Sequence, residues 1–204
     1  MAIYLIRHGE TAGNATRVVQ QPDIPLSPNG IDQARRLAGR LTDQGIGRIL
    51  ASDLRRAAMT AEAVGETTGA PIRYDALLHE RNFGDVRGTP YAELDFDLFA
   101  PDYDPPGGES WERFEARMDE AWVLIQRAAG ECQENLAVIT HGLVCRSVVA
   151  RRALLPEGVD RDLSGLAWRN TSLTILDGPD PWRVRLLNCS AHLEEAEPQE
   201  SGAV

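Results

Sequence analysis

The 204-residue chain contains no lysine, so all 21 of its Lys and Arg residues are arginines. A codon bias against lysine explains such an absence without any functional cause. Whatever its origin, a phosphate group bound by a side-chain cation must here meet an arginine or a charged histidine. The planar guanidinium group suits this contact, because it donates two parallel hydrogen bonds to one oxyanion.

Cysteines and long apolar runs are also scarce. Cys132, Cys145 and Cys189 are widely spaced and form no CxxC pair, which predicts buried free thiols in a reducing compartment. No stretch approaches the roughly 18–20 continuous apolar residues of a membrane span. The N-terminal MAIYLIRHG has no basic region ahead of its short apolar run, unlike a signal peptide. We therefore expect a cytoplasmic protein with no membrane partner.

The charge of the chain is acidic overall but unevenly distributed. A net charge of −10 argues against a nucleic-acid partner. Residues 1–60 contain eight arginines and five acidic residues, whereas residues 61–204 contain 13 arginines and 26 acidic residues. The excess of arginine is thus confined to the N-terminal part.

Hydrophobic periodicity predicts alternating strands and helices in a chain long enough for one α/β domain. Apolar runs predict strands at 2–6, 48–51, 136–139, 172–176 and 183–187. Helical spacing and capping residues predict helices that begin near residues 28, 54, 110 and 143. Such alternation implies a three-layer α/β sandwich, with a mostly parallel sheet covered by helices on both faces. We expect one domain over 1–193, a long excursion at 84–108, and a disordered acidic tail over 194–204.

Polar motifs follow three of the predicted strands. RHG (7–9) follows the first, SDLRRA (52–57) the second and THG (140–142) the strand at 136–139. In sheets with parallel strands, ligands bind beyond the carboxyl ends of the strands. We therefore expect these three motifs to face one ligand.

The residue types at this edge point to phosphoryl chemistry. His8 and His141 each precede a glycine, which we expect to let a ligand approach the backbone. The nearby guanidinium groups, supplied by Arg7, Arg55 and Arg56, suit the charge spread over phosphoryl oxygens. One imidazole would act as nucleophile and form a phosphohistidine, while the other would donate to a transferring oxygen.

A leaving alkoxide also needs a proton, and Glu80 in LLHERNFG is the best candidate donor. Other interpretations of these residues remain open at this point. His8 and His141 could bind a metal with His79 as a third ligand, although adjacent arginines oppose a cation. Glu80 could be an ordinary surface acid.

The motifs together resemble the histidine phosphatase superfamily, in the branch of the cofactor-dependent phosphoglycerate mutases and related small phosphatases. The resemblance extends from residue 3 to about residue 176. It rests on LIRHGET, Asn14, DIPLSPNGIDQA, SDLRRAAMTA, LHERNFGDVRG, PPGGESWERF, VITHGLVCR and NTSL in this order. Each piece alone is weak, whereas all of them in order are specific.

This resemblance implies a role for each matching position. His8 would be the phosphorylated nucleophile, with Glu80 as proton donor and later as base. The other implied catalytic residues are Arg7, Arg56 and His141, and the implied phosphate-binding groups are Asn14 and the Gly142 amide. No metal and no cofactor are implied. Gln20 stands where the family often has glycine, which changes the expected pocket wall there.

Hydrolysis of a small phosphomonoester is the function that we predict. A phosphoglycerate mutase needs extra cations over its pocket, whereas the 84–108 excursion is acidic and carries only Arg87. We expect Arg81 to supply one additional substrate-binding cation. A catalytically inactive phosphate-binding module is the third alternative, but none of the implied catalytic residues is missing. The sequence leaves a homodimer open.

Overall fold

A computed structural model describes residues 1–194. Its helices are α1 (Ala12–Thr16), α2 (Pro28–Leu41), α3 (Arg55–Thr68), α4 (Trp111–Gly130) and α5 (Gly142–Arg152). Its strands are β1 (Ala2–Arg7), β2 (Ile46–Ala51), β3 (Ile72–Tyr74), β4 (Asn135–Thr140), β5 (Leu173–Asp177) and β6 (Arg183–Cys189). The predicted acidic tail lies outside the described residues, apart from Glu194.

The strands form one six-stranded sheet in the order β3-β2-β4-β1-β5-β6. The pairs β1–β4, β2–β4 and β2–β3 are parallel, whereas β5 runs antiparallel to both β1 and β6. The predicted three-layer α/β fold with a mostly parallel sheet is therefore confirmed. The short strand β3 and the short helix α1 were not predicted, because neither is long enough to show a period.

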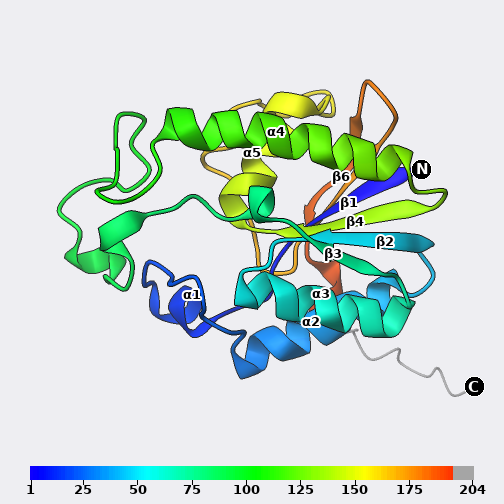
Figure 1. The fold of residues 1–204 in the computed structure, drawn as a ribbon, viewed down its shortest axis with the longest axis horizontal. Helices are drawn as coiled ribbons and strands as arrows, with labels where there is room; N and C mark the ends of the chain where they lie inside the picture. The colour runs from blue at the N-terminus through cyan, green and yellow to red at the C-terminus, as the bar shows by residue number, and fades with distance from the viewer. Residues whose placement is uncertain (195–204) are drawn as a thin grey trace, which may run out of the picture.

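Helices cover both faces of the sheet (Figure 1). Alternate residues of β1 point to opposite sides, so Ile3 and Leu5 pack with α4 and α5, while Tyr4 and Ile6 pack with α2 and α3. Both apolar clusters are almost completely buried. The sheet is thus a rigid central layer, and its carboxyl edge is held from both sides.

Strand register brings the predicted motifs together. Arg7 on β1 pairs with Thr140 on β4, so the two histidines that follow these strands become neighbours. Ala51 on β2 pairs with Ile139, which places the SDLRRA segment at the same edge. Because β5 is antiparallel, its first residue pairs with Ile6, and the segment 168–172 reaches this edge as well.

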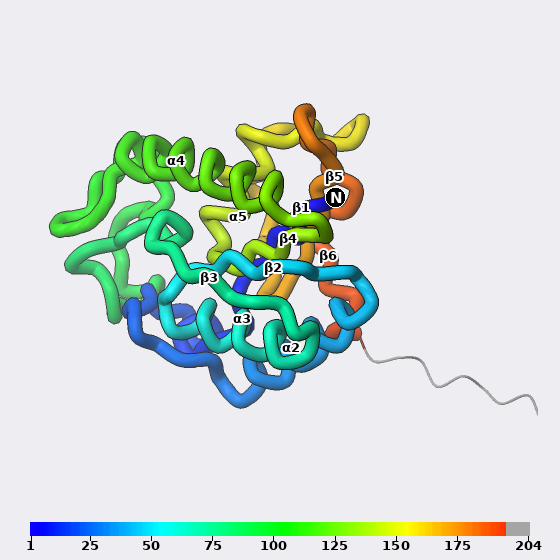
Figure 2. The backbone as a smooth tube through the Cα atoms, turned by 45° about the vertical axis from the view of Figure 1, so that its right-hand side comes forward, coloured from blue at the N-terminus to red at the C-terminus, as the bar shows by residue number. Residues whose placement is uncertain are grey.

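The 84–108 excursion is an ordered part of the molecule. It packs on a third, smaller apolar cluster built around Val19, Phe83 and Leu98. Its backbone lies beside the segment that follows α1 (Figure 2). The excursion therefore forms one wall above the carboxyl edge of the sheet.

Two further expectations concern thiols and membranes. All three cysteines are free thiols, but only Cys145 is buried, so the prediction of buried thiols is wrong for Cys132 and Cys189. Cys132 lies just beyond the end of α4, and Cys189 is the last residue of the edge strand β6, so neither lies in the interior layers. No helix in residues 1–194 is long and apolar enough to cross a membrane.

Candidate active site

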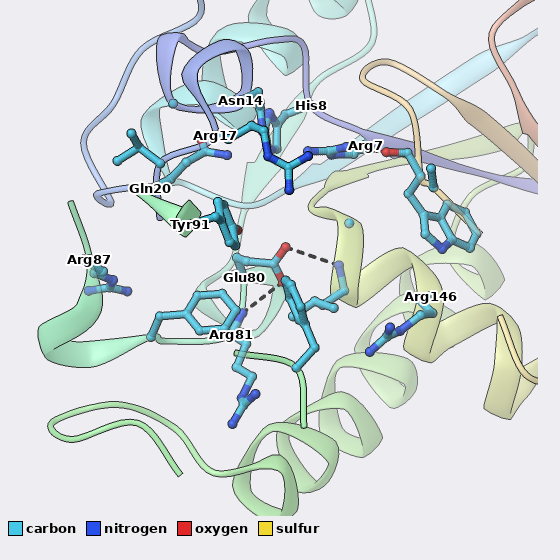
Figure 3. Close-up of a pocket in the computed structure, with 18 of the residues that line it drawn as sticks. Arg7, His8, Asn14, Arg17, Gln20, Glu80, Arg81, Arg87, Tyr91 and Arg146 are labelled. Atoms are coloured by element: carbon cyan, nitrogen blue, oxygen red, sulfur yellow. Dashed lines mark hydrogen bonds between the residues drawn. The ribbon is translucent and has the colours of Figure 1, made fainter. Parts of the chain in front are cut away.

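The carboxyl edge of the sheet opens into a cavity of about 1020 Å³ (Figure 3). Residues from the end of β1, the starts of α3 and α5, α1, and the 84–108 excursion line it. Of the residues predicted to form the site, those that line the cavity are Arg7, His8, Asn14, Arg56, Glu80, Arg81 and Gly142. His141 lies directly behind His8.

The imidazole of His8 is oriented by its own backbone neighbour. Nδ1 lies 2.7 Å from the carbonyl oxygen of Gly9. A carbonyl only accepts hydrogen bonds, so Nδ1 carries the ring proton and Nε2 keeps its lone pair. The Nε–H of Arg56 donates to Nε2 over 3.2 Å. His8 thus presents a neutral nucleophilic nitrogen beside a cation.

Burial keeps this imidazole uncharged. His8 is 2% exposed. Desolvation, followed by the charges of Arg56 and Arg7, lowers the pKa of His8 well below 6.5. The nucleophilic form is therefore the resting form at neutral pH.

His141 is held against His8 from the other side. The two ring centroids are 5.1 Å apart, and the Nε2 atom of His141 lies 2.8 Å from Oγ of Ser52. Burial, with the charge of Arg56 as the next cause, lowers the pKa of His141 well below 6.5. Its Nδ1 is buried and has no partner within residues 1–194. A ligand oxygen beside His8 would complete the hydrogen bonding of this atom.

Two arginines, one half-buried and one buried, supply positive charge next to the histidines. Arg56, in the first turn of α3, is 3% exposed and is anchored by the carbonyl of Gln21 at 3.1 Å. Burial lowers the pKa of Arg56 to about 10, so it stays charged at neutral pH. Arg7 donates to the carbonyl of Trp168, while its buried Nε has no partner in the described part of the chain. These guanidinium groups are placed to bind phosphoryl oxygens.

Glu80 is fixed by two backbone donors. Its carboxylate accepts from the N–H of Arg81 at 3.0 Å and from the N–H of Leu143 at 3.2 Å (Figure 3). The second contact ties the residue to the first turn of α5. An acid or base group therefore lies in the same cavity as His8 and the two arginines.

Asn14 is oriented by two donors. Its Oδ1 accepts from the backbone N–H of Thr11 and from Nδ2 of Asn170. This identifies the opposite side of the amide as the NH₂ group, which lies in the cavity without an acceptor in residues 1–194. Asn170 also donates to the carbonyl of His8. Asn14 can thus donate to a bound anion.

A family model of the histidine phosphatase superfamily (branch 1) matches residues 3–190 of this chain. The chain belongs to this superfamily. Phosphoglycerate mutase-like protein 4 of Arabidopsis thaliana is 33% identical, over 98% of this chain and 90% of its own.

Solved structures of this superfamily have the same fold. YhfR of Bacillus stearothermophilus superposes with a TM-score of 0.81 at 30% identity, over 95% of this chain and 99% of its own. The mycobacterial glucosyl-3-phosphoglycerate phosphatase, in its complex with VO3, has a TM-score of 0.75 at 30% identity, with 91% and 97% covered. Proteins similar to this one thus include both phosphatases and mutase-like proteins.

The contacts of Arg81 argue against the substrate-binding role that we predicted for it. Its guanidinium donates to three backbone carbonyls, those of Leu98, Tyr103 and Glu109, and lies 4.0 Å from the ring centroid of Trp111. Arg81 is 1% exposed. These bonds occupy three of its five N–H donors, so we expect Arg81 mainly to anchor the excursion. Trp111 is half-buried and lines the cavity.

The structure explains the glycine after His8 by packing, and not by the approach of a ligand that we predicted. A Cβ at Gly9 would lie 2.7 Å from the carbonyl oxygen of Gly30 on α2, so this glycine permits close packing between two segments. A Cβ at Gly142 would lie 3.6 Å from Nε of Arg7, next to the phosphate-binding groups.

Gln20 replaces the expected glycine without closing the cavity. Its side chain accepts from the hydroxyl of Thr11 at 2.9 Å and packs against Gly13. The substituted wall is therefore made of a fixed amide that lines the cavity.

Sequence reasoning missed several cavity residues. Arg17, Arg146, Tyr91 and Trp168 all line it. Arg146 was detectable, because it lies four residues after Gly142 and so on the same face of α5. The others come from segments that the sequence does not connect.

The metal alternative finds no support in the side chains. His79 pairs with Asp53 outside the cavity. No group of three or more metal-ligating side chains occurs within residues 1–194. Arg55 is exposed and pairs with Glu62, so Arg56 is the arginine of SDLRRA that lies in the site.

Proposed function

We propose that this protein hydrolyses a small phosphomonoester in two steps, through a phosphohistidine on His8. The observation that carries the proposal is the tautomer of His8, whose proton is held at Nδ1 by Gly9 while Nε2 stays neutral beside Arg56. Membership of the histidine phosphatase superfamily supports this assignment. The substrate is a small molecule that enters the cavity above His8.

In the first step, Nε2 of His8 attacks phosphorus and the bond from phosphorus to the ester oxygen breaks. Arg7 and Arg56 bind the equatorial oxygens, together with the Asn14 amide and the N–H of Gly142 at the start of α5. His141 donates to the same group. Protonated Glu80 transfers its proton to the departing oxygen, so the product leaves as an alcohol.

In the second step, water replaces the alcohol. The carboxylate of Glu80 takes one proton from this water as its oxygen attacks phosphorus. The bond from phosphorus to Nε2 breaks, and inorganic phosphate and neutral His8 are restored. Glu80 ends the cycle protonated, as it began.

A mutase is the second candidate, and one observation favours it. Arg17, Arg87 and Arg146 line the cavity, so it holds more positive charge than the excursion alone indicated. Hydrolysis remains our choice because a cavity of about 1020 Å³ is large enough to admit water beside a small product. Retention of all predicted catalytic residues argues against an inactive binding module.

The experiment is a rapid quench of the enzyme with a ³²P-labelled phosphomonoester into alkaline detergent, where phosphohistidine survives. Wild-type protein and His192→Gln, a histidine outside the cavity, should carry acid-labile label. His8→Gln should carry none and should lose turnover. Label and turnover in that variant would overturn the mechanism. With 3-phosphoglycerate, phosphate release measured by ³¹P NMR indicates hydrolysis, and accumulation of 2-phosphoglycerate indicates the mutase.

A further inference from the structure

The arginines that line the cavity differ from most other arginines of residues 1–194 in forming no ion pair with a carboxylate. Nine of the 15 arginines outside the cavity form an ion pair with a carboxylate. None of the six that line it does so within residues 1–194. In a chain with ten more acidic than basic residues, such unpaired cations repel one another and are stabilised by a bound anion.

The six arginines are not equivalent. Arg7 and Arg56 lie beside the histidines, and Arg81 is used by backbone carbonyls. The three that remain are Arg17, Arg87 and Arg146. Figure 3 shows Arg17 and Arg87 on the side of Tyr91, and Arg146 on the opposite side, on α5.

A short ladder of backbone hydrogen bonds holds Arg17 and Arg87 on the same wall. Gly88 donates to Val19 over 2.7 Å, Val19 to Thr89 over 3.0 Å, and Tyr91 to the carbonyl of Arg17 over 2.9 Å. Arg17 is itself the left-handed cap of α1, with φ of 56°. Two distant segments thus hold two guanidinium groups above the cavity.

Neighbouring groups leave these two cations available. Arg17 lies over the ring of Tyr91, with 5.9 Å between its Cζ and the ring centroid. The cavity carboxylates other than Glu80 have their own partners: Asp97 accepts from the N–H of Phe99, and Glu115 from Ser147 and Arg151. Arg56 donates to the carbonyl of Gln21 over 3.1 Å, and the side chain of Gln21 lies beside Gly88, so this wall adjoins the phosphate site.

We infer that Arg17 and Arg87 form a second anion-binding subsite, and that the preferred phosphomonoester carries a carboxylate or a second phosphate on its alcohol portion. This inference rests on the hydrolysis proposed above. The reacting phosphate would lie between His8 and Arg56, and the second anion against the ladder. The subsite is a property of two wall segments and takes no part in the bond changes at phosphorus.

The test uses straight-chain alkyl phosphates of three to six carbons whose far end is a hydroxyl, a carboxylate or a phosphate. For wild-type enzyme, kcat/KM should be at least about tenfold higher for one anionic end than for the hydroxyl at some chain length. The end that gives the higher ratio identifies the anion, and added salt should reduce the ratio. In the double variant R17Q/R87Q the ratio should fall to near one, and R17K/R87K should keep part of it.

Two further variants make the outcome decisive. R35Q/R113Q removes two exposed arginines outside the cavity, on α2 and α4, so it changes the net charge as much as R17Q/R87Q does and should keep the wild-type ratio. Loss of the ratio in R146Q but not in R17Q/R87Q would overturn this assignment, as would a wild-type ratio near one. If the enzyme hydrolyses all of these esters with equal kcat/KM, only the subsite is rejected. If it hydrolyses none of them and His8 is not labelled, the proposed function itself is rejected.

Discussion

The Nε–H of Arg56 donates to Nε2 of His8 over 3.2 Å, so a cation from α3 contacts the nitrogen that we assign as nucleophile. A hydrogen-bond donor at this position requires the nitrogen to be unprotonated. Arg56 thus helps to keep His8 neutral before a phosphate arrives, and the same guanidinium is then available to a phosphoryl oxygen.

This relationship predicts a pH effect of Arg56→Gln. Burial is the main cause of the lowered pKa of His8 and remains in the variant, but the repulsion by Arg56 is lost. The pKa of His8 should therefore rise, and loss of the neutral form on acidification should begin at a higher pH than in wild type. A titration of the His8 ring by ¹⁵N NMR measures this directly. Arg55→Gln, at an exposed neighbour, should leave the titration unchanged, and an unshifted or lowered pKa in Arg56→Gln would contradict the argument.

Glu80→Gln tests the proton donor through the leaving group. An alkoxide needs a proton as it leaves, and general acid catalysis contributes roughly 10²–10⁴-fold. An activated aryl oxide leaves without one, so the variant should slow phosphorylation by alkyl phosphates much more than by aryl phosphates. Single-turnover formation of phosphohistidine is the measurement, because Glu80 also acts in the second step.

Glu115→Gln serves as the matched control for this comparison. It changes a carboxylate of the same cavity that already pairs with Arg151, and it should affect both substrate classes equally. Equal losses in Glu80→Gln would show that another group supplies the proton, with Asp97, a further carboxylate of the cavity, as the next candidate.

Arg81→Met should destabilise the molecule through the excursion. The substitution leaves three carbonyl oxygens without their donor and should cost about 3 kcal/mol in the free energy of unfolding. Urea unfolding measures this cost, and proteolysis should become faster within residues 84–108. Arg113→Met, at an exposed arginine of α4, should stay within about 0.5 kcal/mol. If Arg81→Met keeps the wild-type free energy of unfolding, the three carbonyls do not need Arg81, and its guanidinium would be available to bind a substrate.

Chelation should leave the rate almost unchanged. Arg7 and Arg56 already supply positive charge at the phosphate site, so the chemistry that we propose needs no divalent ion. Turnover after dialysis against a strong chelator is the measurement. A rate lost on chelation and restored by one added divalent metal would contradict it.

Much of the fold follows from local patterns. Ser27 and Pro28 open α2, and Gly69 closes α3 in the left-handed conformation, as their residue types predict. The alternation of apolar runs with helical periods predicted the layers, because each period reflects a face that must be buried. The three residues of β3 show no such period, and only their pairing with β2 makes them a strand.

The centre of the site was predictable for a similar reason. RHG and THG directly follow β1 and β4, and parallel strands end at one edge, so sequence position alone places His8 near His141. It was harder to predict which arginine of SDLRRA lies in the site, because adjacent residues of a helix point in different directions. The resemblance to known relatives resolved it in favour of Arg56.

The amino-acid sequence by itself determined the layers, the strand ends and the pair of histidines, since these depend on local periods and on parallel pairing. Only the tertiary structure decided the use of the remaining arginines. Arg81 donates hydrogen bonds to carbonyls that lie 17 to 28 residues away in the sequence. Arg17, in contrast, is held at the cavity by the backbone ladder with residues 88–91. Contacts between such distant segments depend on how the excursion packs over Val19, Phe83 and Leu98, and no local pattern of residues encodes that packing.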